Sequence, residues 1–232
     1  MPPPVGIKEK TRSVKRYLRI LEKKHRIGSA PSQATILDQL IHHLLSFEAP
    51  MTNATKAIRM MREEFVDWND VRVSGIREIA NILEECRISI EQAYQLKEIL
   101  GQLFIHGHTI SLDFLLEMEP DTARKFVNRL RGLPGWAGTY LLALTGKGII
   151  VPLDPHTSRV GQRLGLFGRK STVQTRTQTL KSIVSNEDTL RFHQLFVEHG
   201  KKTCRIENPR CDVCSLARDC EYRRKLKKAR SN

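Results

Sequence analysis

The sequence predicts an all-α protein. Apolar residues recur at helical spacing along most of its 232 residues, and no segment shows the apolar-polar alternation that would indicate a strand. In the middle of the chain, residues 133–138 read LPGWAG, a sharp turn between two helical patterns. No internal repeat of solenoid length is present. The length suits one domain or two small ones.

The first expected helix covers residues 8–26 and is strongly basic. It contains nine Lys or Arg residues. Four apolar residues follow the i, i+3, i+4, i+7 spacing of one helix face: Val14, Tyr17, Leu18 and Leu21. Two interpretations stay open for this amphipathic helix, direct contact with DNA or a solvated helix that packs by one narrow apolar stripe.

The same periodicity predicts helices along the rest of the chain. The residues Ser89-Ile90-Glu91-Gln92 form a candidate capping box, which would start one of these helices at Ile90. The apolar run at residues 140–144 is expected to begin the helix that follows the turn. The other expected helices cover residues 32–47, 75–85, 90–104, 111–117, 121–131, 171–185 and 188–200, with one more that starts after Thr52.

The chain carries 39 Lys and Arg against 25 Asp and Glu, a formal charge of +14. Clustered basic residues indicate a polyanionic partner, nucleic acid above all, because neutralised phosphates give affinity without sequence preference. General solubility or association with the ribosome would also explain the charge. The basic tail at residues 223–232 fits either extra phosphate affinity or a frayed terminus.

No apolar run approaches the length of a membrane span, and residues 1–4 lack the charged-then-apolar layout of a signal peptide. We therefore expect a cytoplasmic protein without a membrane partner, associated with the nucleoid through DNA. Thiols stay reduced inside the cell, so clustered cysteines indicate metal binding before disulfides.

Four of the five cysteines lie near the C-terminus with the spacing C-x6-C-x2-C-x5-C: Cys204, Cys211, Cys214 and Cys220. Four thiolates on a short, loop-rich segment suit a tetrahedral zinc ion or the corners of an iron-sulfur cluster, and ligand type alone leaves both open. Cys86 lies on an apolar helix and is expected to be a buried hydrophobic residue rather than a ligand.

The LPGWAG turn is expected to expose backbone amides. Its two glycines, Gly135 and Gly138, let the backbone come close to a ligand, and the first N–H groups of a helix have no intrahelical partner, so the turn can hold a phosphate. Asp154 follows about ten residues after the second helix. A carboxylate there can act on a nucleotide held by the turn. The alternative is a helix N-cap before Pro155.

The LPGWAG hairpin, the acid within LDPHTSRV and the cysteine spacing together resemble the endonuclease III branch of the helix-hairpin-helix DNA glycosylases, over about residues 31–222. The resemblance implies two helical domains, a [4Fe-4S] cluster on the four cysteines, and duplex DNA with a flipped base as the partner. We expect a monomer. The expected parts are the N-terminal helix packed with the cluster domain at 1–30, a helical barrel that ends in the hairpin at 31–145, the C-terminal helices and cluster loop at 146–222, and a basic tail at 223–232.

The resemblance also implies roles for single residues. Asp154 is the catalytic carboxylate, which stabilises the positive charge that develops on deoxyribose as the base departs. Glu48 and Ile88 lie on loops that carry wedge or gap-filling residues. His156 matches a histidine beside the DNA, and Arg159 supports the loop of the acid. Contacts with the DNA backbone are implied for Gly135, Ala137, Gly138, Arg205 and Arg210.

The hairpin departs from the bifunctional members of that family, which carry a lysine four residues after the first hairpin glycine as a Schiff-base nucleophile. Thr139 stands at that place and Tyr140 follows, and neither forms an imine. We therefore expect a monofunctional glycosylase that uses water, with Thr139 and Tyr140 beside Asp154 among the catalytic candidates. Lys147, the nearest lysine, lies between two glycines in an expected turn.

Two alternatives stay open: a glycosylase that is also an AP lyase through another amine, and a catalytically silent DNA-binding homologue. His42 and His43 lie on the helix that contributes a catalytic carboxylate in the adenine glycosylases. One of them facing the base pocket is one interpretation. A buried core histidine is the other.

Overall fold

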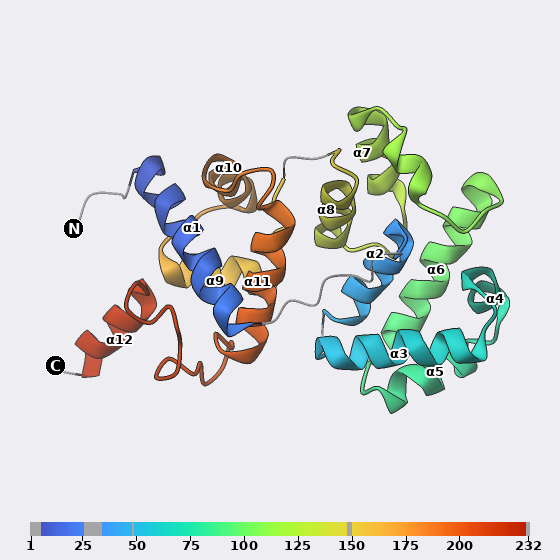
Figure 1. The fold of residues 1–232 in the computed structure, drawn as a ribbon, viewed down its shortest axis with the longest axis horizontal. Coiled ribbons are helices and arrows are strands. Elements are labelled where there is room, and N and C mark those ends of the chain that lie inside the picture. The colour runs from blue at the N-terminus through green and yellow to red at the C-terminus, as the bar shows by residue number, and fades with distance from the viewer. Residues whose placement is uncertain (1–5, 26–33, 48, 148–149, 231–232) are drawn as a thin grey trace. The chain divides into compact units, whose positions relative to one another are not determined.

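The computed structural model describes residues 6–25, 34–47, 49–147 and 150–230, and within them it contains helices and no strand (Figure 1). The predicted all-α fold class is confirmed. The chain forms two compact units, Met1–Gly28 with Ile149–Asn232, and Ser29–Gly148. The helices are α1 (Ile7–Lys24), α2 (Ile36–Leu45), α3 (Met51–Glu64), α4 (Trp68–Val73), α5 (Ile76–Glu85), α6 (Ile90–Gly107), the 3-10 helix η1 (Asp113–Leu116), α7 (Pro120–Arg129), α8 (Gly135–Leu144), α9 (Pro155–Leu164), α10 (Val173–Ile183), α11 (Thr189–Lys202) and α12 (Glu221–Arg230).

The first unit is built around α11, which packs against α9 and α1 (Figure 1). Phe192 and Phe196 of α11 are fully buried and stacked, with ring centroids 3.9 Å apart. The predicted apolar stripe of α1 lies in the same core, because its four residues are all buried. Each large apolar side chain contributes about 1.5 to 3 kcal/mol when buried, so this stripe is enough to fix α1 to the unit. Most Lys and Arg side chains of α1 are exposed.

The second unit surrounds α2, which is buried along most of its length and packs against α3, α6 and α8. A capping box starts α2: Thr35 Oγ1 accepts from the Asp38 amide at 3.1 Å, and Asp38 Oδ2 accepts from the Thr35 amide at 3.1 Å. Asp38 Oδ1 also accepts from Trp68 Nε1 at 2.9 Å. Burial alone would raise the pKa of Asp38, but the hydrogen bonds from Trp68 and Thr35 outweigh it and lower the pKa.

Several helix starts differ from the prediction; the expected helix at residues 111–117, for example, is the shorter 3-10 helix η1. Helix α2 starts at Ile36 rather than residue 32, because Thr35 is its N-cap, and residues 32 and 33 lie outside the described ranges. Helix α3 starts at Met51, directly after Pro50. Helix α8 starts at Gly135 rather than Tyr140, so the glycine turn is itself the first turn of the helix.

The predicted capping box at Ser89 is wrong. Helix α6 does start at Ile90 with Ser89 as its N-cap residue, but the Ser89 side chain forms no capping hydrogen bond. It bonds instead to the Glu91 side chain, and this lowers the pKa of Glu91. The sequence pattern therefore located the helix start and gave the wrong partner for the hydroxyl.

Three helices, α4, α9 and α12, are absent from the list of expected helices, although the N-cap alternative for Asp154 implied the start of α9. Helix α4 has six residues, too few for an apolar period to show. Its N-cap is Asp67, whose Oδ1 accepts from the Asp70 amide at 2.8 Å. Helix α12 extends through most of the basic tail, so the described part of the tail, up to residue 230, is helical rather than frayed. None of the described helices is both long and apolar enough to cross a membrane.

Candidate functional site

The turn between α7 and α8 uses its glycines in different ways. Gly132 has φ of 76°, a conformation that other residues rarely adopt. Gly138 lies inside α8, where an added Cβ would lie 3.0 Å from Val127 Cγ1 of α7, so this glycine lets the two helices approach. Gly135 is exposed, and no heavy atom lies within 4 Å of the position of its Cβ. Of these three glycines, Gly135 is therefore the one with open space where a Cβ would lie.

Hydrogen bonds within the turn reduce the number of amides that are available to a phosphate. The Ala137 and Gly138 amides donate to Pro134 O at 2.8 Å and 2.9 Å. Gly135 and Trp136 are the first two residues of the helix, where an amide has no intrahelical acceptor. Their N–H groups are the donors that α8 offers to an anion, while Ala137 and Gly138 serve helix start and packing.

An aromatic cluster joins α8 to α2 inside the second unit. Tyr140 is buried and stacks on His43, with ring centroids 3.8 Å apart. Trp136 stacks on Phe47 at 4.2 Å and meets His43 edge-on at 5.2 Å. His43 is therefore a core histidine, as the second interpretation held. His42 is partly exposed, with Nε2 3.0 Å from Thr55 Oγ1.

Thr139, at the place of the family's lysine, uses its hydroxyl within the helix. Its Oγ1 donates to Gly135 O at 2.9 Å, one turn back along α8. This bond leaves a neutral, weakly acidic hydroxyl without a neighbouring base in the described contacts of α8. Lys147 lies in the turn after α8, where its amide donates to Leu142 O at 3.0 Å.

Asp154 is the N-cap of α9 and is 1% exposed. Its Oδ1 accepts from the amides of His156 at 2.5 Å and Thr157 at 3.0 Å. Its Oδ2 accepts from Thr157 Oγ1 at 2.7 Å and lies 3.2 Å from His193 Nδ1. Three donors of α9 thus hold the carboxylate, and His193 Nδ1 lies within contact distance of it. Asp154 is therefore an N-cap, as the alternative held. This does not exclude catalysis, because the same contacts hold the carboxylate in place to stabilise a positive charge.

His193 and His156 flank this carboxylate as neutral rings. Burial lowers the pKa of His193 despite the nearby Asp154 carboxylate. Burial also lowers the pKa of His156, to about 4, again against the effect of Asp154. His156 Nδ1 lies 3.1 Å from Arg159 Nη2, and since a guanidinium only donates, Nδ1 is the acceptor and the ring proton is on Nε2.

Arg159 links α9 to the segment that carries the cysteines. Its Nε donates to Cys204 O at 2.8 Å, and its Nη2 donates to Gly200 O at 3.1 Å. At Gly200 an added Cβ would lie 2.8 Å from His156 Cβ, so α11 and α9 touch there. The structure therefore gives Arg159 a wider role than support for the loop of the acid.

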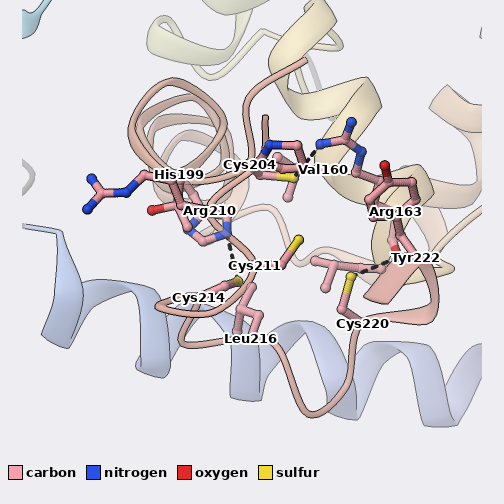
Figure 2. A pocket seen from close by; sticks show the side chains of 13 residues that line it. Val160, Arg163, His199, Cys204, Arg210, Cys211, Cys214, Leu216, Cys220 and Tyr222 are labelled. Carbon is pink, nitrogen blue, oxygen red and sulfur yellow. Dashed lines mark hydrogen bonds between the residues drawn. The ribbon is translucent and has the colours of Figure 1, made fainter. Parts of the chain in front are cut away.

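All four C-terminal cysteines line one pocket, and none forms a disulfide (Figure 2). Arg163 Nη1 donates to Cys204 Sγ at 3.3 Å, and His199 Nε2 lies 3.5 Å from Cys214 Sγ. Burial raises the pKa of Cys214 to about 11, and burial also raises the pKa of Cys211 and Cys220.

The pocket fits a cluster by the number and type of its donors. A [4Fe-4S] cluster is held by four cysteine sulfurs, each on a different iron, so the sulfurs surround a space rather than meet at one atom. Figure 2 shows the four sulfurs around one such space. Within the described residues, no set of three or more His, Cys, Asp or Glu side chains is arranged to hold a metal ion. Cys86 is buried and is not among the pocket residues, as predicted.

Comparison with known proteins supports the same architecture, although no protein-family model matches the chain. The chain is 31% identical over 111 residues to an endonuclease III of Sulfolobus acidocaldarius, which covers 48% of this chain and 50% of that protein. It is 22% identical over 178 residues to protein ROS1C of Oryza sativa, 69% of this chain and 10% of that protein. For an endonuclease III of Thermotoga maritima, the identity is 24% over 189 residues, 80% of this chain and 83% of that protein. The chain thus spans half or less of the length of the first two of these relatives.

Solved structures share the fold over nearly the whole chain. Endonuclease III in a trapped covalent intermediate with DNA superposes with a TM-score of 0.70 at 17% identity, over 94% of this chain and 98% of that chain. A thermostable thymine-DNA glycosylase superposes with a TM-score of 0.71 at 18% identity, with the same coverage. The chain therefore has the fold of endonuclease III and of this thymine-DNA glycosylase.

The remaining residues predicted to contact DNA differ in their exposure. Arg205 and Arg210 are exposed on the cysteine loop. Ile88 is 3% exposed, so the structure does not display it as a wedge. Glu48 lies outside the described residues.

Sequence reasoning missed two polar residues of α11 that interact with the candidate acid, His193 and Lys201. Burial lowers the pKa of Lys201 to about 8, while the charges of Glu198 and Asp154 act to raise it. His193 falls in the segment 188–200, whose apolar period predicts only a helix, and Lys201 lies one residue beyond that segment. They can be identified only from the structure, because their interaction with Asp154 depends on the packing of α11 against α9.

Proposed function

We propose that the chain is a DNA glycosylase that hydrolyses the N-glycosidic bond of a damaged or mispaired base in duplex DNA. The observation that carries the proposal is the carboxylate of Asp154, held by three donors at the start of α9 and approached by His193 of α11. It stands in a fold shared with a DNA-bound endonuclease III and a thymine-DNA glycosylase. A fixed carboxylate is the group that base removal needs, since positive charge develops on the sugar as the base departs.

The proposed chemistry follows from the environment of Asp154. The target base leaves the stack before its bond to the sugar can be reached. The Asp154 carboxylate then stabilises the oxocarbenium-like sugar, and its fixed position avoids the cost of reorganisation during the reaction. A water molecule supplies the nucleophile, because the Thr139 hydroxyl bonds to Gly135 O and forms no imine. We therefore propose a monofunctional enzyme.

Binding to DNA is proposed to rest mainly on the backbone phosphates. The amides of Gly135 and Trp136 point to an anion at the start of α8, where the helix dipole also favours negative charge. The formal charge of +14 gives affinity without sequence preference. Exposed Arg205 and Arg210 would add to it on the cysteine loop.

A [4Fe-4S] cluster is proposed on Cys204, Cys211, Cys214 and Cys220. The support is the donor set itself, four free cysteines that line one pocket. When bound, the cluster would crosslink the loop to the start of α12 and provide a site for one-electron chemistry. Iron and sulfide analysis of the purified protein tests this proposal. One cluster per chain is expected, and zinc in its place would overturn it.

An incision assay tests the glycosylase. The purified protein is incubated with duplexes that carry uracil, thymine glycol, alkylated purines, or A or T mispaired with oxoguanine or G, each with and without hot alkali. Breaks that require alkali are expected on at least one duplex. The variant Asp154→Asn should lower the single-turnover rate by about 100-fold or more. Breaks without alkali would contradict the monofunctional mechanism.

Two variants separate chemistry from helix capping. Asp154→Ser keeps a good N-cap but removes the carboxylate, so it should be inactive and still bind DNA. Asp67→Asn changes another capping aspartate, at the start of α4, and should leave the rate unchanged. No breaks with any duplex, together with intact DNA binding, would favour the silent DNA-binding homologue.

A second candidate is a glycosylase that is also an AP lyase, and Lys201 favours it. Burial lowers the pKa of this amine to about 8, so a useful fraction is neutral and nucleophilic near that pH. Its charge interacts with that of Asp154. Attack of the amine on C1′ of an abasic sugar would release water and form an imine, and loss of the C2′ proton would then expel the 3′ phosphate.

Borohydride trapping tests this second candidate. Covalent protein–DNA product that forms with the wild type and disappears in Lys201→Arg would establish it. Lys202→Arg is the matched control, since Lys202 is adjacent but pairs with Glu198. Absence of trapped product in the wild type would leave hydrolysis as the mechanism.

A further inference from the structure

Asp154 has a buried contact on α11 that the capping geometry of α9 does not explain. His193 and Asp154 both have completely buried side chains, and His193 Nδ1 lies 3.2 Å from Asp154 Oδ2. The same Nδ1 lies 3.1 Å from Pro152 O and 3.4 Å from Thr157 Oγ1. The Nδ1 atom of His193 thus contacts Asp154, the segment before Asp154 and helix α9 after it.

The acceptors around this nitrogen fix the position of its proton. A backbone carbonyl has no hydrogen to donate, so the contact with Pro152 O requires a hydrogen on Nδ1. The Asp154 carboxylate accepts from both amides on Oδ1, and it accepts again on Oδ2. The Nδ1 hydrogen is therefore shared between Pro152 O and Asp154 Oδ2. His193 is neutral in this arrangement, because burial lowers its pKa.

We infer that His193 is a positioning residue for Asp154, which aims the carboxylate by donating its Nδ1 hydrogen to Oδ2 and to the carbonyl of Pro152. This inference rests on the proposed role of Asp154 in base removal. The three donors from α9 fix the carboxylate only relative to its own helix. His193 adds a contact from a second helix. Contacts from two helices restrain both the position and the orientation of the carboxylate, as catalysis requires of a reacting group.

Because His193 is neutral, the pair of His193 and Asp154 retains the negative charge of the carboxylate. A protonated ring beside Asp154 would offset the charge that the developing oxocarbenium needs. Among the groups that act on His193, Lys201 disfavours its protonation, whereas Asp154 and the hydrogen bond with Pro152 O favour it. His156 lies on the other side of the acid and is itself neutral near pH 7, with a pKa lowered to about 4.

Two substitutions separate positioning from packing. His193→Leu fills a similar volume and removes the donor, so kcat should fall by about 10- to 100-fold while KM for the duplex stays the same. His193→Asn places an amide N–H near the position of Nδ1 and should recover most of kcat. Equal losses in both variants, or no loss in His193→Leu, would overturn the inference.

A measurement on the wild type does not depend on either variant or on catalysis. Proton-nitrogen NMR correlation of the imidazoles at neutral pH should assign the hydrogen of His193 to Nδ1. In Asp154→Ser, the Nδ1–H resonance should shift, because one of its two acceptors is lost. A hydrogen on Nε2 of His193 in the wild type would overturn the inference whether or not the protein cleaves any duplex, whereas failure of the incision assay alone would remove only the proposed function.

Discussion

The guanidinium of Arg163 lies 4.5 Å from the ring centroid of Tyr222, and it also contacts the loop that begins at Cys204. Its Nη1 donates to Arg205 O at 2.6 Å, and its Nη2 donates to Ile206 O at 3.2 Å. One side chain of α9 therefore joins both ends of the cysteine segment. The positive charge also lies beside thiols that must lose protons to bind metal.

Replacement of Arg163 should loosen the cysteine loop. Arg163→Leu removes the charge-assisted hydrogen bonds and the ring contact, and we expect it to lower the free energy of unfolding by about 2 kcal/mol. Iron per chain should fall in parallel. Urea unfolding and iron analysis measure the two effects. Arg163→Lys keeps the charge without the planar fork and should recover only part of each, and Arg169→Leu, an exposed arginine, should change neither.

Two glycines of the hairpin should respond in opposite ways to alanine. Gly135→Ala has open space for its Cβ, so it should keep the wild-type Tm and weaken DNA binding by blocking the approach of a phosphate. Gly138→Ala puts a Cβ 3.0 Å from Val127 Cγ1, so it should lower stability by about 1 to 3 kcal/mol. Thermal unfolding and fluorescence anisotropy with duplex DNA distinguish the two. Unchanged DNA binding in Gly135→Ala would remove this turn from the proposed interface.

Stability should fall on the acid side of neutrality because of His193. Above about pH 6.5 the ring is neutral in both the folded and the unfolded chain and has no effect. Below that pH the unfolded chain takes up a proton that the folded protein excludes, since burial lowers the folded pKa. The loss approaches about 1.4 kcal/mol per pH unit for this residue. Urea unfolding at about pH 7.5 and 5.5 measures it. His193→Asn should show a smaller decrease than the wild type.

The sequence predicted the elements that are long and periodic, and it failed where contacts are not periodic. The stripe of α1 is fully described by residues three and four apart, and all four predicted positions are buried. The six residues of α4 carry no such period, and Asp67 and Trp68 anchor it through single polar contacts. Such contacts depend on which helices meet in space.

The candidate site shows the same division. Asp154 and the four cysteines follow from motif and spacing along the chain. The contact between Asp154 and His193 does not, because it forms only when α11 packs across the start of α9. The hairpin could be predicted from the sequence only in part. Its motif predicts an amide-rich turn, but the start of α8 at Gly135 decides which amides remain available.

The basic face of α12 should contribute to DNA affinity in a way that depends on salt. Arg224 and Lys228 are exposed one turn apart on this helix. If both contact phosphates, Arg224→Gln with Lys228→Gln should reduce the slope of log K against log salt by up to about 1.8, since each neutralised phosphate contributes about 0.9. Anisotropy titrations with duplex DNA from about 50 to 200 mM salt measure the slope. The control Arg59→Gln with Arg77→Gln removes the same charge from α3 and α5. Equal slopes for the two double variants would mean that net charge, and not contact by α12, sets the affinity, whereas a loss specific to Arg224 and Lys228 assigns the C-terminal helix to the DNA interface.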